Sequence, residues 1–194
     1  MRFVIICAIF FAAVVLNVSG QSNFACRLAD SALTLTKQRV TYDPGYFILS
    51  YPNGDVPADK GVCTDVVIRA YRKLGIDLQK EIHEDMLANF DIYPAFWGLT
   101  RPDKNIDHRR VPNLMVFFGR HGTRKSISGK PEDYNPGDIV FWNLERGIKH
   151  VGIVAGLKSA DSGRYMIIHN IGSGQVLEDI LFKFEIIGHY QYGN

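Results

Sequence analysis

The chain has 194 residues, of which 46% are hydrophobic and 22% are charged, with 18 Gly, 8 Pro and 3 Cys. These values exclude a disordered chain and a collagen-like repeat, and three cysteines are too few for a disulfide scaffold. The formal net charge of +2 gives no indication of nucleic-acid binding. The length predicts one globular domain.

The first twenty residues have the pattern of a secretory signal peptide. Arg2 is followed by fourteen uncharged residues, Phe3 to Leu16, and then by small residues up to Gly20. The apolar run is shorter than the roughly 20 residues that span a bilayer, and a short membrane anchor is the alternative. We therefore expect cleavage near Gly20 and a periplasmic or secreted protein without stable membrane insertion.

Along the remaining chain, helical periodicity comes first and strand-like runs follow. The clearest helix begins at Cys63, because apolar residues recur from there to Leu74 at the spacing of one helix face. Asp77 is a predicted N-cap, and Pro112 fits the first turn of a helix. The predicted helices cover residues 25–38, 63–74, 77–90 and 112–120. The predicted strands cover residues 46–51, 138–142, 150–155, 165–170 and 184–190.

This order predicts an α+β fold in which N-terminal helices pack on a C-terminal antiparallel β-sheet. We expect residues 21–194 to form a single domain with an insertion at about 76–136. No Walker or dinucleotide glycine pattern is present, so no cofactor is expected. The run from His83 to Asp85 lacks the spacing of a helical metal site, so no metal is expected either.

One cysteine and two histidines have the placement needed for nucleophilic catalysis. Cys63 lies at a helix start, where free N–H groups and the helix dipole favour a thiolate and are expected to lower the thiol pKa. His150 opens one predicted strand and His169 ends the next, so a hairpin would bring both to one end of the sheet. The three residues then supply a nucleophile, a base and an orienting group. The alternatives are a core cysteine, structural histidines, or a disulfide between Cys26 and Cys63.

Several charged residues are candidates for substrate binding. Asp65 follows Cys63 within one turn and either caps the helix, which is favoured, or binds a substrate amine. Asp107, His108, Arg109 and Arg110 form a compact charged motif. Its arginines either bind substrate carboxylates bidentately or hold the insertion through internal salt bridges.

Longer blocks of the sequence resemble a known family. The run from Asn135 to Trp142, followed by His150-Val151-Gly152-Ile153-Val154, is similar to the strand pair of NlpC-type cysteine peptidases. The blocks 51–57, 61–70, 107–114, 168–172 and 188–190 resemble the YijF-like proteins, exported bacterial proteins of unknown function in the same superfamily. The chain departs from the peptidases at the nucleophile, where Val62-Cys63-Thr64-Asp65 replaces Asp-Cys-Ser-Gly.

The resemblance implies a papain-like fold with Cys63 as nucleophile, His150 as base and His169 as third residue. It also suggests Tyr42 as the tyrosine that assists the oxyanion. The function expected is an exported, monomeric thiol hydrolase that cleaves amide bonds in peptidoglycan stem peptides. The alternatives are a non-catalytic cell-wall binding module on the same fold and a related acyl or amide transferase.

Overall fold

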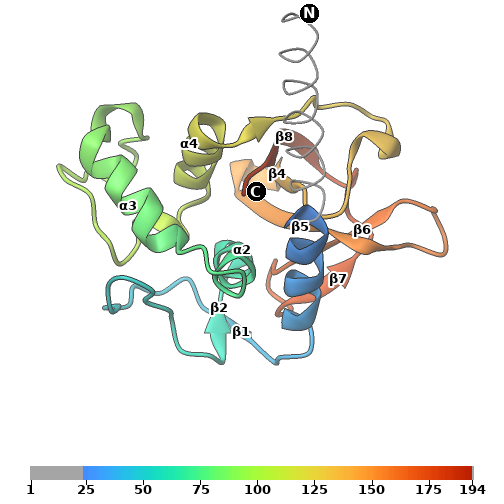
Figure 1. The fold of residues 1–194 in the computed structure, drawn as a ribbon, viewed down its shortest axis with the longest axis horizontal. Helices are drawn as coiled ribbons and strands as arrows, with labels where there is room; N and C mark the ends of the chain where they lie inside the picture. Colours follow the sequence, from blue (N-terminus) through green and yellow to red (C-terminus); the bar gives the residue numbers. More distant parts are fainter. Residues whose placement is uncertain (1–23, 194) are drawn as a thin grey trace, which may run out of the picture.

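The computed structural model describes residues 24–193, and the predicted signal peptide lies outside this range. Helices come early in the described chain and the long strands come late (Figure 1). Within residues 24–193, no helix has the length and apolar character needed to cross a bilayer. The first helix is described over residues 24–35. The further helices are α2 (Cys63–Arg72), α3 (Leu78–Ala88) and α4 (Val111–His121), with 3-10 turns η1 (Phe90–Ile92), η2 (Asp107–Arg109), η3 (Pro131–Asp133) and η4 (Glu145–Gly147).

Six strands form one sheet in the order β3-β8-β4-β5-β6-β7, and every neighbouring pair is antiparallel. These strands are β3 (Thr123–Arg124), β4 (Ile139–Asn143), β5 (Lys149–Lys158), β6 (Tyr165–His169), β7 (Val176–Glu178) and β8 (Glu185–Gln191). A second, parallel pair joins β1 (Thr41–Tyr42) to β2 (Lys60–Gly61). The predicted α+β class with an antiparallel sheet is confirmed.

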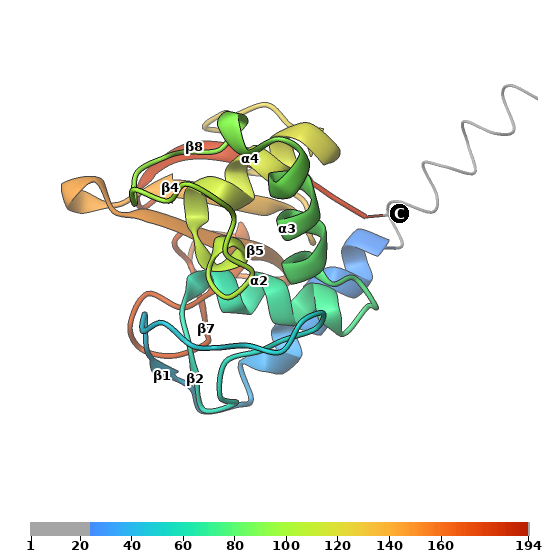
Figure 2. The ribbon, with the colours of Figure 1, turned by 90° about the vertical axis from the view of Figure 1, so that its left-hand side faces the viewer.

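Helix α2 packs against the central strand β5, as Figure 2 shows. Its apolar stripe, including Val66 and Tyr71, is fully buried in one large core with Val151 and Ile153 of β5. A smaller core around Trp142 covers the other face of the sheet. Side chains alternate across a strand, so consecutive residues of β5 serve the two cores. This packing holds the first turn of α2 close to the beginning of β5.

The local signals for helix ends are confirmed. Asp77 is the N-cap of α3, and its carboxylate accepts hydrogen bonds from the N–H groups of Gln79 and Lys80. Pro112 lies in the first turn of α4, where its missing N–H has no helical partner to lose. The predicted strands of the main sheet are present to within a few residues, and the sequence reading missed only the short strands β1, β2, β3 and β7.

The strand predicted at residues 46–51 is wrong, because this segment is irregular up to a turn at its end. Its backbone groups bond to side chains rather than to a neighbouring strand. The N–H of Leu49 donates to the Asn105 side chain, and the carbonyl of Ser50 accepts from the Gln79 side chain. A segment whose hydrogen bonds are met in this way has no need of a strand partner.

Candidate active site

The first turn of α2 directs backbone N–H groups at the thiol of Cys63. The backbone N–H groups of Val151 in β5, of Thr64 and of Cys63 itself lie close enough to the sulfur to lower the pKa of the thiol. Val151 directly follows His150, so the thiol lies beside the strand position of the predicted base. Cys63 is only 6% exposed. The predicted nucleophile is therefore placed at the junction of helix and sheet.

The expected lowering of the Cys63 pKa is wrong. Burial raises the pKa of the Cys63 thiol to about 12, and the negative charge of Asp65 acts in the same direction. The three N–H groups lower the pKa but do not overcome this effect, because the free-energy cost of removing a thiolate from water exceeds the stabilisation that they provide. Both Cys26 and Cys63 are free thiols, so the alternative of a disulfide between them is excluded.

The two histidines lie together, as the hairpin prediction required. Strands β5 and β6 pair antiparallel, and Nε2 of His150 lies 3.2 Å from Nδ1 of His169. Their rings meet edge to face, with centroids 5.1 Å apart. Burial lowers the pKa of His150 to about 3, with a smaller contribution from His169. His150 is therefore a neutral imidazole at physiological pH, which is the form that accepts a proton.

A fourth residue, Glu178, extends this pair into a chain. Its Oε2 lies 3.1 Å from Nε2 of His169. The two are on one face of the sheet, since β7 pairs with β6 in the register Ile167↔Glu178. A carboxylate accepts only, so it fixes the tautomer with the proton on Nε2 of His169. Nδ1 of His169 then accepts from Nε2 of His150, which leaves Nδ1 of His150 as the free basic nitrogen.

The sequence reading did not find Glu178, because β7 has only three residues and was not predicted. The signal that was available is the short apolar run Val176-Leu177, which follows the glycine-containing turn after His169. Reading that run as the next strand of the meander would have placed Glu178 on the face of His169.

Contacts of Asn170 and Tyr42 with Gly61 bring the segment before Cys63 close to the end of β6 and to β1. The side chain of Asn170, next to His169, donates to the carbonyl of Gly61, two residues before Cys63. Tyr42 pairs with Gly61 across β1 and β2. Burial, followed by the nearby Cys63 and Asp65, raises the pKa of Tyr42, so its phenol keeps its proton. The predicted Tyr42 therefore does lie near Cys63, with 40% of its surface exposed.

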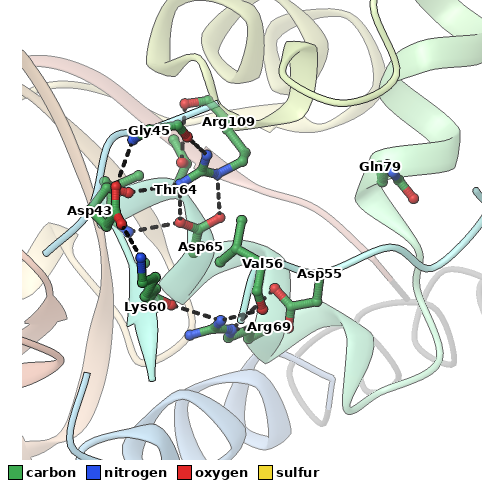
Figure 3. A network of polar contacts seen from close by, with 12 residues as sticks. Asp43, Gly45, Asp55, Val56, Lys60, Thr64, Asp65, Arg69, Gln79 and Arg109 are labelled. Atoms are coloured by element: carbon green, nitrogen blue, oxygen red, sulfur yellow. Dashed lines mark hydrogen bonds and ion pairs between the residues drawn. The ribbon is translucent and has the colours of Figure 1, made fainter. Parts of the chain in front are cut away.

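The charged residues around α2 form an internal network, drawn in Figure 3. Asp65 and Arg109 make a two-pronged ion pair, with Nε to Oδ1 at 2.9 Å and Nη2 to Oδ2 at 3.0 Å. Their side chains are only 3% and 1% exposed. Arg109 also donates to the carbonyls of Asp43 and Gly45, and Asp65 accepts from the N–H of Val62. The capping role of Asp65 is confirmed.

The rest of the charged motif is also buried or stacked. Asp107 is buried, and burial raises the pKa of its carboxyl to about 6. Burial also lowers the pKa of His108 to about 3, so this ring is neutral. Arg110 stacks over the Trp97 ring at 4.0 Å and lies 3.8 Å from Asp107. The geometry matches the internal salt-bridge alternative, and a substrate contact by Asp65 or Arg109 would require their ion pair to open.

Among residues 24–193, no group of three or more His, Cys, Asp or Glu side chains is arranged to hold a metal ion.

The sequence matches the model of a family described as a domain of unknown function, DUF1287, over residues 29–192. The chain belongs to the DUF1287 family. It is also 50% identical over 175 residues to a protein of Escherichia coli (strain K12) described as uncharacterized protein YijF, covering 90% of this chain and 85% of that protein. The resemblance to YijF-like proteins is therefore confirmed.

Among solved structures, the DUF1287 chain is similar to NlpC1 from Trichomonas vaginalis, with 17% identity and a TM-score of 0.46. The similarity covers 87% of this chain and 44% of that one, so the chain spans less than half of the solved protein's length.

Proposed function

We propose that this chain is an exported thiol hydrolase that cleaves amide bonds in peptidoglycan stem peptides. The single observation that supports this most strongly is the ordered hydrogen-bond chain of His150, His169 and Glu178, on strands of the sheet that packs against the helix beginning at Cys63. The order of the three predicted residues along the chain agrees with NlpC-type peptidases.

The pKa values favour a neutral cysteine and histidine pair over a thiolate and imidazolium pair. In the proposed reaction, Nδ1 of His150 takes the thiol proton while the sulfur of Cys63 attacks the amide carbon. N–H groups at the start of α2 and the phenol of Tyr42 donate hydrogen bonds to the oxyanion. His150 then gives its proton to the leaving amine, and a thioester to Cys63 remains.

Water completes the cycle. His150 accepts a proton from water as the oxygen attacks the thioester carbon, and the thiol leaves with that proton. The products are an amine and a carboxylic acid, and the enzyme is restored. His169 and Glu178 do not touch the substrate in this scheme. They are positioning residues that hold the basic nitrogen of His150 in place.

The test is release of soluble peptide from purified sacculi. We expect release by the wild type and by Cys26→Ala, a matched variant at the exposed cysteine, and none by Cys63→Ala. Loss of the base in His150→Ala should lower the rate by at least about 100-fold, and Glu178→Gln should lower turnover less. Equal release by the wild type and Cys63→Ala would overturn the proposed mechanism.

The buried, protonated thiol also favours a second function, a module that binds cell-wall peptide without cleaving it. Co-sedimentation with sacculi separates the two functions. Binding by the wild type with no product release assigns the binding module, whereas release that depends on Cys63 assigns the hydrolase.

A further inference from the structure

A groove of about 540 Å³ lies beside the candidate active site. One wall is the segment 36–42, which leads from the first helix into β1, and the other is the turn 172–176, which leads from β6 into β7. The two walls lie close together, since a side chain at Gly174 would meet the carbonyl oxygen of Val40. Tyr42 lines one wall and lies near Cys63, and Val176 on the other wall pairs with His169. Cys63 and the two histidines do not line the groove, but Tyr42 and Val176 connect it to the thiol and to His169.

The charged side chains that line the groove are all basic. Lys37 and Arg39 are exposed on one wall, and no Asp or Glu is among the described residues that line it. Neither basic side chain has an ion-pair partner among the salt bridges of the described residues. Unpaired basic groups at the rim of a concave site attract anionic ligands and bind carboxylates.

Gln175 anchors the turn that forms one wall of the groove. Its side chain is only 5% exposed, and its Nε2 donates to the carbonyl of Leu35 at 3.1 Å.

The edge strand β7 offers a surface on which an extended peptide can bind. β7 is at the edge of the six-stranded sheet, so the outer side of Val176 has no strand partner within that sheet. An extended peptide is bound at such an edge through its main chain, with side-chain groups providing specificity.

We propose that this groove is the subsite for an acidic, extended peptide, with Lys37 and Arg39 holding its carboxylates. The inference rests on the proposed function, since it names the part of the site that selects the substrate. It explains how the chain recognises carboxylate-rich peptides although Arg109 is engaged in an internal ion pair.

The test measures binding separately from cleavage. The probe is a synthetic stem tetrapeptide with an N-terminal fluorescein and free carboxylates, and it is titrated into the Cys63→Ala variant so that none is consumed. We expect the additional change Lys37→Gln with Arg39→Gln to weaken binding by tenfold or more. The matched control, Lys130→Gln with Lys158→Gln, removes the same charge from exposed residues outside the groove and should leave the affinity unchanged.

A second probe, with each carboxylate converted to a carboxamide, should bind the unchanged groove as weakly as the acidic probe binds the double variant. Equal affinity for the two probes, equal affinity with and without Lys37 and Arg39, or no binding of the acidic probe would overturn the inference. Binding that depends on the groove without Cys63-dependent cleavage would leave the inference standing and remove the proposed function. Cys63-dependent cleavage with an unchanged KM in the Lys37→Gln, Arg39→Gln variant would overturn the inference and leave the proposed function standing.

Discussion

Alkylation of Cys63 tests the physical state of the candidate nucleophile. With a thiol pKa of about 12, about one molecule in ten thousand carries a thiolate at pH 8. A free cysteine with a pKa of about 8.5 is about one quarter ionised at the same pH. Since the thiolate is the reactive form, we expect iodoacetamide to label Cys63 at least about a thousandfold more slowly than the exposed Cys26.

Mass spectrometry of tryptic peptides after timed labelling follows both cysteines in one sample. The rate at Cys63 should rise about tenfold for each pH unit between pH 8 and 10, because ionisation is far from complete there. In urea, where the burial is lost, the two cysteines should react at similar rates. A Cys63 rate that levels off near neutral pH, or that is within tenfold of the Cys26 rate, would refute a buried neutral thiol and indicate an ion pair with histidine.

Two further predictions concern stability. Asp65→Asn leaves the Arg109 guanidinium buried without its carboxylate, and we expect it to lower the free energy of unfolding in urea by about 3–5 kcal/mol. The exposed Asp161→Asn is the control, and an equal effect of the two changes would contradict the importance of the buried pair. His150 has a pKa of about 3 when folded, so below about pH 6.5 the unfolded chain binds a proton that the folded chain does not. The free energy of unfolding should therefore fall through this group by about 1.6 kcal/mol between pH 6.5 and 5, and His150→Gln should remove that part of the pH dependence. Parallel urea-derived pH profiles for the wild type and His150→Gln would show that His150 is not buried in the neutral form.

Much of the fold follows from local patterns in the sequence. The helix that begins at Cys63 is set by apolar residues at helical spacing, and the start of α3 by the side chain of Asp77. The strands that carry His150 and His169 are set by short β-branched runs, and their pairing follows from the short connection between them. These features depend on residues close in sequence, which is why the helix start and the histidine pair could be predicted together.

Only the tertiary structure decided the chemical state of those residues. The pKa of Cys63 depends on how completely α2 and β5 exclude water, and that outweighs the helix-start effect on which the sequence prediction was based. Glu178 reaches His169 through a sheet register, and Arg109 reaches Asp65 from a distant 3-10 turn. Burial and long-range pairing depend on elements that are far apart in the chain, so local sequence patterns do not predict them. The sequence therefore predicted Cys63, His150 and His169 as members of the candidate site, whereas the packing determined their protonation and added Glu178 as a partner.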